Sequence, residues 1–108
     1  MTKTSQISGF HNLKPLERIR IVKEFAALTD EEVSILQSTG SLKLEQADRM
    51  IENVIGTMPI PLGIATNFLI NGRDYLIPMA IEEPSVVAAA SNAAKIARVR
   101  GGFNTSST

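Results

Sequence analysis

Apolar residues recur at helical spacing in the first part of the chain, with charged residues between them. Pro15 suits the first turn of a helix, because the N–H that proline lacks would have no partner there. The apolar positions after it are Leu16, Ile19, Val22 and Phe25/Ala26. This spacing predicts a helix that begins near Pro15.

Two further helices are expected before residue 57. Thr29 is a candidate N-cap and Glu32 follows three residues later, which is the spacing of a capping box. A short helix should follow and end at Gly40. A third helix is expected over 44–54, closed by Gly56. The apolar faces would be Val33 and Leu36 in the short helix, and Leu44, Ala47, Met50/Ile51 and Val54 in the third.

The pattern then changes to two short apolar runs, 64–70 and 75–81, on either side of Asn71-Gly72. Asn-Gly between such runs predicts a β-hairpin, because both residues tolerate positive φ. Pro78 in the second run indicates an edge position or a bulge. The uncharged stretch 53–72 has the length of a membrane span, but its prolines, glycines and asparagines interrupt a helix, so we interpret it as buried loop and strand.

A last, alanine-rich helix is expected to start at Pro84, run through 85–98 and stop at Gly101-Gly102. Its small face would allow close packing against the hairpin. That face consists of Val86, Val87, Ala90, Ala94 and Ala97. Three helices, a hairpin and one more helix define an α+β fold class.

Composition limits the classes of function. The chain has 108 residues, the size of one domain or of a piece of a larger one. Eleven basic and 11 acidic residues give zero net charge, which argues against nucleic acid as a partner. The absence of cysteine excludes disulfides and thiolate chemistry. Residues 1–9 lack the apolar core of a secretory signal, so we expect a cytoplasmic protein with no membrane partner.

Glu82 and Glu83 are the most suggestive candidates for chemistry, because they lie where a strand ends and a helix begins. The simpler interpretation is that they cap the helix. The functional interpretation is that one carboxyl is desolvated beneath the hairpin, which would raise its pKa and make it a general acid. His11 is the only histidine and cannot form a metal site alone. Lys95, Arg98 and Arg100 form a basic cluster that the dipole of a helix C-terminus explains.

The string Glu52-Asn53-Val54-Ile55-Gly56 stands between the helical part of the chain and the predicted hairpin. Four longer segments follow it: 57–65 (TMPIPLGIA), 67–74 (NFLINGRD), 78–90 (PMAIEEPSVVAAA) and 94–103 (AKIARVRGGF). These segments and 9–13 resemble hydroxymethylglutaryl-CoA reductases, in particular their soluble class II, and the string 52–56 is similar to a motif of that family's dimer interface. The resemblance covers essentially the whole chain, in register.

The resemblance implies reduction of the thioester hydroxymethylglutaryl-CoA to mevalonate, or the reverse, with NADH or NADPH and no metal. It implies that Glu83 is the catalytic acid, that Ser85 contacts the hydroxymethylglutaryl group, and that His11 lies near coenzyme A. The string 52–56 would form the interface of a homodimer or a higher homo-oligomer.

The family's catalytic lysine, aspartate and histidine, and its cofactor-binding small domain, have no counterpart here. We therefore expect a helical segment over 1–56 and the start of the substrate-binding large domain over 57–108. We also expect no cofactor-binding residue in this segment and no activity of the segment alone. The alternative is a stand-alone module that oligomerises without catalysis.

Overall fold

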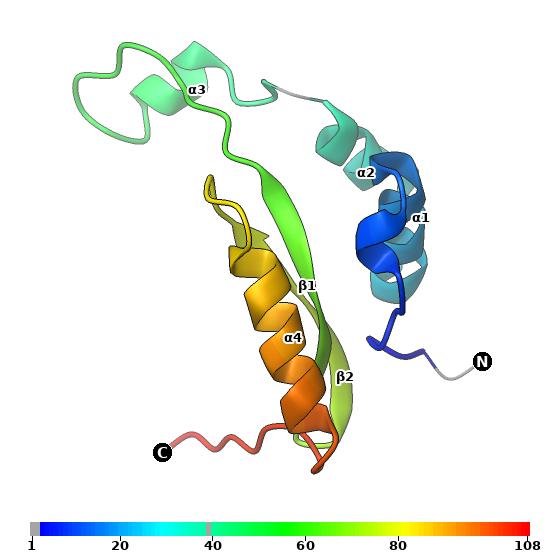
Figure 1. Cartoon of the computed structure of the whole chain (residues 1–108). Coiled ribbons are helices and arrows are strands. Elements are labelled where there is room, and N and C mark those ends of the chain that lie inside the picture. The colour runs from blue at the N-terminus through cyan, green and yellow to red at the C-terminus, as the bar shows by residue number, and fades with distance from the viewer. Residues whose placement is uncertain (1–2, 39) are drawn as a thin grey trace.

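The computed structural model describes residues 3–38 and 40–108. The helices and strands, in chain order, are the 3-10 helix η1 (Phe10–Asn12), α1 (Pro15–Ala26), α2 (Asp30–Gln37), α3 (Leu44–Asp48), β1 (Leu62–Ile70), β2 (Arg73–Ala80) and α4 (Val86–Arg98). Figure 1 shows α4 lying along the two-stranded sheet, with the N-terminal helices to one side. The predicted α+β class is confirmed.

The predicted hairpin is present. β1 and β2 pair antiparallel, from Leu62 opposite Ala80 to Ile70 opposite Arg73. Asn71 and Gly72 both have positive φ, 49° and 75°, as a two-residue turn between strands requires. Among the described residues the sheet has two strands, so Pro78 lies in an edge strand there, as predicted. The bulge is in the opposite strand, between Ala65 and Phe68.

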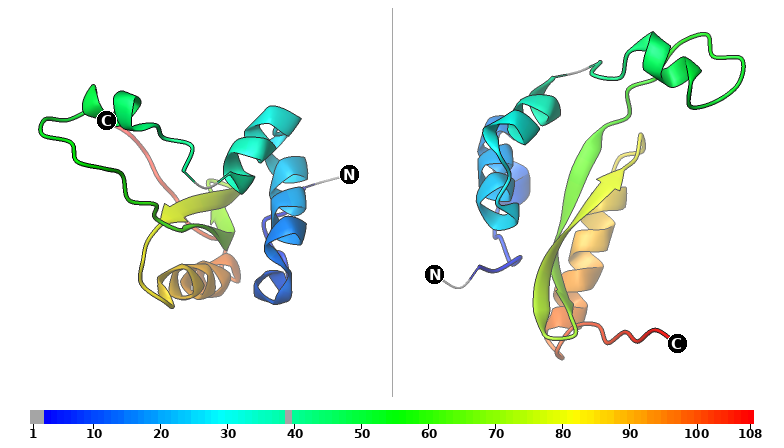
Figure 2. Two further views of the ribbon diagram at one scale, coloured as in Figure 1. Left: turned by 90° about the horizontal axis from the view of Figure 1, so that it is seen from above. Right: turned by 180° about the vertical axis from the view of Figure 1, so that it is seen from behind.

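Helix α4 packs its small face against β1 (Figures 1 and 2). Ala94 on the helix and Ala65 on the strand are 1% and 0% exposed. A side chain at Gly63 would lie 3.2 Å from the Val87 side chain, so the glycine permits this close approach. The predicted small-residue face is confirmed. The helix itself begins at Val86, two residues after the predicted Pro84.

The first two predicted helices are also present. α1 begins at Pro15, and the Glu17 carboxylate accepts a hydrogen bond from the Lys14 N–H at 2.9 Å at its N-terminus. Thr29 caps α2 as predicted: its hydroxyl accepts from the Glu32 N–H at 3.1 Å, and the Glu32 carboxylate accepts from the Thr29 N–H at 2.8 Å. α2 ends at Gln37, three residues before the expected stop at Gly40.

The predicted third helix is wrong in length. α3 ends at Asp48 instead of Val54, and turns follow it. Ala47 is buried, but Met50 and Ile51 are 68% and 66% exposed, so the expected apolar face has nothing to pack against after Ala47. A short helix without packing is marginal. Asn53 then has φ 57°, which a continuing helix would not allow.

The prediction of a buried loop before β1 is also wrong. Ile55, Met58 and Ile60 are 101%, 89% and 57% exposed. Figure 1 shows this segment as a wide loop beyond the end of the hairpin. Within the described residues, no helix is long and apolar enough to cross a membrane.

Candidate functional site

The loop 81–85 joins β2 to α4 at the end of the hairpin where β1 begins. The Ile81 N–H donates to the Pro61 carbonyl at 3.2 Å, which ties this loop to the segment that enters β1. Gly63 and Val87 bring the start of β1 against the first turn of α4. Residues 82–85 therefore lie beside the segment that leads from the exposed loop into β1 (Figure 2).

Glu82 and Glu83 are both exposed. Neither carboxylate makes a hydrogen bond or an ion pair with any residue that the structure describes, and no acidic side chain lies in the first turn of α4. In the described chain both side chains are open to solvent, so the structure shows no carboxyl desolvated beneath the hairpin. The simpler interpretation, a carboxylate that caps α4, is not supported either.

Ser85 has an unusual backbone. It is the N-cap of α4 with φ 73° and ψ −11°, the left-handed region that serine rarely adopts. Its carbonyl accepts the first bond of the helix from the Ala89 N–H at 2.8 Å, while its hydroxyl makes no capping bond. Such a conformation costs on the order of 1–3 kcal/mol and is concentrated at functional sites. In this backbone conformation the exposed Ser85 hydroxyl does not form the usual capping bond.

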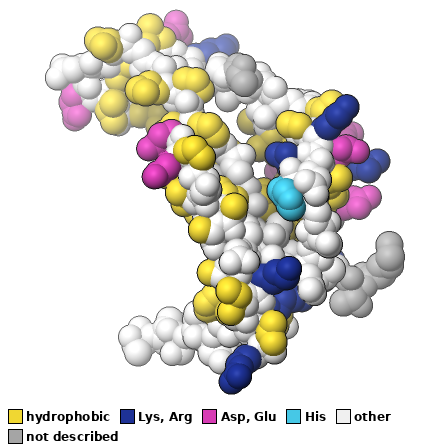
Figure 3. Space-filling model, viewed as in Figure 1, with side chains coloured by type: hydrophobic (Ala, Val, Ile, Leu, Met, Phe, Trp, Pro, Cys, Tyr) yellow, Lys and Arg dark blue, Asp and Glu magenta, His cyan; other side chains and the backbone are white. Residues whose placement is uncertain are grey.

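His11 lies in η1, on a different element from Glu83 and Ser85. Its side chain is exposed, and its carbonyl accepts a hydrogen bond from Arg18 Nη2 at 3.2 Å. Figure 3 shows the histidine side chain in cyan on the surface of the molecule. The structure thus brings Glu83 and Ser85 together within one loop and leaves His11 separate from them.

The string 52–56 lies in the exposed loop between α3 and β1. Val54 is half-buried, whereas Glu52, Asn53, Ile55 and Gly56 are exposed. Other large apolar side chains of the same loop are exposed as well: Met50, Ile51, Met58 and Ile60. Space-filling side chains of this region form an apolar surface in Figure 3.

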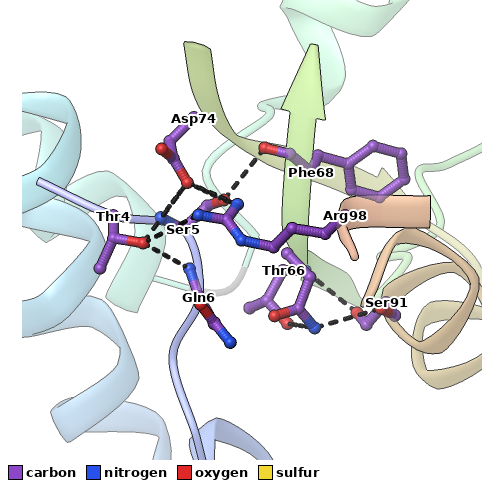
Figure 4. Close-up of polar contacts among 9 residues, drawn as sticks. Thr4, Ser5, Gln6, Thr66, Phe68, Asp74, Ser91 and Arg98 are labelled. Atoms are coloured by element: carbon purple, nitrogen blue, oxygen red, sulfur yellow. Dashed lines mark hydrogen bonds and ion pairs between the residues drawn. The ribbon is translucent and has the colours of Figure 1, made fainter. Parts of the chain in front are cut away.

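A polar cluster that the sequence analysis did not find joins three distant segments (Figure 4). Arg98 Nη1, at the end of α4, donates to Asp74 Oδ1 of β2 at 2.7 Å. The same carboxylate oxygen accepts from the Ser5 N–H at 3.0 Å and lies 2.9 Å from the Ser5 hydroxyl. The Ser5 carbonyl accepts from the N–H of Asn67 at 3.0 Å. We call Ser5, Asp74 and Arg98 the N-terminal anchor.

The anchor also lowers the pKa of the Asp74 carboxyl. Burial by itself would raise the pKa of Asp74, but hydrogen bonds from Arg98 and Ser5, together with the arginine charge, outweigh it and hold the pKa at about 2 instead of 3.8. Ser5 is 0% exposed. The partners are 24 to 69 positions apart, so no local pattern could have found them. An isolated serine in a polar leader carries no such signal.

A second group of polar contacts sets the register between α4 and the bulge of β1, and Figure 4 shows part of it. The Thr66 N–H donates to the Ser91 hydroxyl at 3.0 Å, and that hydroxyl donates to the Val87 carbonyl at 2.9 Å. Asn67 Nδ2 donates to the Ser91 carbonyl at 3.1 Å. Because the bulge leaves these strand groups out of the pairing with β2, they can bond Ser91. These bonds fix the position of α4 along its own axis.

Gln6, Lys95, Arg98 and Val99 line a cleft of about 270 Å³ that is open to solvent. No glycine-rich turn feeds a helix N-terminus there, which is the usual cradle of a diphosphate. Within residues 3–38 and 40–108, no group of three or more histidine, cysteine or acidic side chains could hold a metal ion.

The architecture is that of an α+β domain whose candidate chemistry lies in a strand-to-helix loop. Comparison with known proteins identifies the family of this domain. The family model described as hydroxymethylglutaryl-coenzyme A reductase matches residues 14–108. The chain belongs to this family.

Two relatives show how far the similarity extends. The chain is 67% identical over 105 residues to the 3-hydroxy-3-methylglutaryl-coenzyme A reductase of Archaeoglobus fulgidus, covering 97% of this chain and 24% of the relative. It is 38% identical over 88 residues to a probable reductase of Borreliella burgdorferi, covering 82% of this chain and 20% of the relative. The chain therefore spans about a quarter or less of the length of these relatives.

Solved structures of the same family have a similar fold. The reductase of Streptococcus pneumoniae superposes with a TM-score of 0.81 at 39% identity, covering 92% of this chain and 24% of that one. A class II reductase structure from the same organism, bound to NADPH in open conformations, gives a TM-score of 0.80 at 39% identity, covering 90% and 26%. The fold of the described residues is thus similar to one part of a class II reductase.

Proposed function

We propose that the full-length protein containing this chain reduces hydroxymethylglutaryl-CoA to mevalonate, or catalyses the reverse reaction. One thioester, two molecules of NADPH or NADH and two protons give mevalonate, coenzyme A and two oxidised cofactors. The observation that carries the proposal is the match over residues 14–108, which includes the loop with Glu83 and Ser85. NADPH is the cofactor bound in one of the similar structures.

Within this reaction we assign Glu83 to the thioester carbonyl. Its carboxyl would donate a hydrogen bond to the substrate oxygen and hold the proton needed as that oxygen becomes a hydroxyl. The open position of the loop supports this role, because a substrate and the rest of the protein can cover it. Covering of the loop would then remove water from around the Glu83 carboxyl in the full-length enzyme.

Ser85 and His11 would bind the two ends of the substrate. The Ser85 hydroxyl, which makes no capping bond, would contact the hydroxymethylglutaryl group. His11 is exposed on η1 and would contact coenzyme A. A developing oxyanion also needs a cation or several donors aimed at it, which one carboxylate cannot supply. We therefore assign that cation, and the cofactor site, to residues outside this chain.

The exposed loop supports a proposal about assembly. Large apolar side chains before and after the string 52–56 are open to solvent, and such a patch marks an interaction surface. We propose that Glu52–Gly56 lies in a homodimer interface. We also propose that residues 1–56 form an N-terminal helical segment and that 57–108 begin the substrate-binding domain.

The experiment compares the full-length protein with the 108-residue chain. We expect the full-length protein to oxidise NADPH or NADH when given hydroxymethylglutaryl-CoA and to form mevalonate. We expect the isolated chain to do neither. Acetyl-CoA, a thioester without the hydroxymethylglutaryl group, is the control substrate. A full-length protein without turnover would contradict the proposal and would favour a non-catalytic module that oligomerises through the exposed loop.

A further inference from the structure

The N-terminal anchor joins an extended leader to a packed unit of secondary structure. Asp74 follows the hairpin turn in β2, and Arg98 is the last residue of α4, so both belong to the packed hairpin–helix unit. Ser5 belongs to an extended leader without helix or strand. Its N–H, its carbonyl and its hydroxyl all have partners in the hairpin, and its side chain is fully buried. The leader is therefore held at one residue by several bonds.

The same leader is also tied to the N-terminal helices. Lys3 Nζ donates to the Phe25 carbonyl of α1 at 2.8 Å and lies 4.9 Å from the centre of the Phe25 ring. Helices α1 and α2 pack against each other, whereas no extensive interface joins the described part of either helix to the sheet or to α4. Residues 3–5 thus connect the helical segment, which carries η1 and His11, to the hairpin–helix unit.

Helix α4 links this connection to the candidate active site. It begins next to Ser85 and ends at Arg98. A helix of 13 residues is a rigid rod of about 20 Å at 1.5 Å per residue. A partner fixed to Arg98 is therefore also fixed relative to the loop at the other end of α4.

We propose that Ser5, Asp74 and Arg98 are positioning residues that set the place of η1, with His11, relative to the Glu83–Ser85 loop. This inference rests on the proposed function, in which a single coenzyme A thioester contacts both places. The anchor fixes the separation between the subsite for the acyl group and the subsite for the coenzyme. Binding of a long substrate depends on that separation, whereas the chemistry at the thioester does not.

The test is made in the full-length protein with two substrates, hydroxymethylglutaryl-CoA and the hydroxymethylglutaryl thioester of pantetheine, which lacks the nucleotide. For Arg98→Met we expect KM for the CoA thioester to rise about tenfold with kcat within about twofold of wild type, the pattern of lost uniform binding. KM for the pantetheine thioester should not change. Arg98→Lys should restore part of the loss. Arg100→Met, an exposed arginine two residues beyond, is the matched control and should leave both substrates unaffected.

Ser5→Ala distinguishes positioning from direct contact. Ser5 is fully buried and cannot touch substrate. A rise in the KM of the Ser5→Ala enzyme for the CoA thioester therefore has to come through the position of the leader. We expect a rise of roughly threefold, confined to that substrate. This variant also serves if Arg98→Met fails to fold, because it removes a single hydroxyl.

Three results would overturn the inference alone: an unchanged KM in Ser5→Ala, an equal loss with both thioesters, or a fall in kcat without a change in KM. A wild-type protein inactive on both thioesters would overturn the proposed function and this inference together.

Discussion

At the scale of single residues, Ser85 and its neighbours set the geometry of the candidate site. The positive φ of Ser85 makes the chain turn sharply between β2 and α4, and this turn leaves Glu82 and Glu83 exposed at the end of the hairpin. Pro84 fixes the backbone between the acid and the serine. Two adjacent carboxylates with no partner among the described residues are chemically alike, so only their positions relative to a bound substrate can separate their roles.

Substitution of the two glutamates in the full-length enzyme tests that separation. Glu83→Gln keeps the shape and most hydrogen bonds but removes the proton, so turnover should fall by about 10²–10⁴ if Glu83 is the general acid. Glu82→Gln should cost no more than about 0.3–1 kcal/mol, the size of a lost charge interaction at a helix end. Steady-state kinetics of both variants provide the measurement, and the reverse ranking would assign the acid to Glu82.

The low pKa of Asp74 makes a second prediction at this scale. Its pKa is about 2 in the folded chain and 3.8 without the anchor, so the ionised form stabilises the fold by on the order of 2 kcal/mol. Because the folded pKa is depressed, this stabilisation is present above about pH 4 and is lost as the pH falls towards 2.

Carboxyl-carbon NMR titration of the chain should give that low value for Asp74, and the pKa should move up towards 3.8 in Arg98→Met. Asp74→Asn should lower the urea midpoint at pH 7 and have little effect near pH 2. A wild-type Asp74 that titrates at its ordinary pKa would mean that the anchor is not formed in solution.

At the scale of elements, the hairpin is extended by a segment that has no strand of its own. Phe103 pairs with Ile70 in a parallel bridge: its N–H donates to the Leu69 carbonyl at 2.8 Å, and its carbonyl accepts from the Asn71 N–H at 2.8 Å. The ring of Phe103 stacks on Phe68 with centroids 5.7 Å apart. Asn71, besides forming the turn, bonds the backbone of Thr105. The turn therefore holds the C-terminal segment in place.

Two neighbouring glycines give a matched test of this arrangement. Gly101 and Gly102 both have positive φ, but a Cβ on Gly102 would lie 2.2 Å from the Leu69 carbonyl oxygen, whereas a Cβ on Gly101 meets nothing within 4 Å. Gly101→Ala should cost about 1–2 kcal/mol from backbone strain alone.

Gly102→Ala should cost about 1–3 kcal/mol more, because the clash separates Phe103 from β1. Amide hydrogen exchange at Phe103 should be much faster in Gly102→Ala than in Gly101→Ala. Equal exchange in the two variants would show that the close approach to Leu69 is not maintained.

At the scale of the whole molecule, the described chain has a small core. Ala47, Ala65 and Ala94 are its buried apolar residues, while many large apolar side chains are exposed. Five of these exposed side chains lie in the loop that contains the string 52–56: Met50, Ile51, Ile55, Met58 and Ile60. An apolar surface of this kind is stable in water only when something covers it.

We predict that the isolated 108-residue chain self-associates. Sedimentation at increasing concentration should show a mass above that of the 11.7 kDa monomer, and a dye specific for apolar surface should bind. Replacing Ile55 and Met58 by serine should shift the equilibrium towards monomer. The same double replacement at exposed polar positions, Glu31 and Gln37, should not. A sharp monomer without dye binding would contradict the prediction.

Local chemistry predicted some elements well, and the reason lies in the range of the interactions. The capping box of Thr29 and Glu32 and the Asn71-Gly72 turn involve residues at most three apart, so their patterns are complete within the sequence. The small face of α4 was found because its spacing follows the helix period. The third helix was predicted too long, because a periodic apolar face shows only where packing is possible and does not supply a partner.

By itself, the sequence determined the fold class, most of the helices, the hairpin and its turn, and the family to which the chain belongs. Only the tertiary structure decided where α3 ends, that Ser85 is in the left-handed region, and that Ser5, Asp74 and Arg98 meet in one cluster. The physical reason is that α3 ends where its apolar face lacks a packing partner, and that the cluster depends on contacts between segments up to 93 positions apart. Such contacts form when α4 and the leader pack on the hairpin, and no local pattern of residues encodes them.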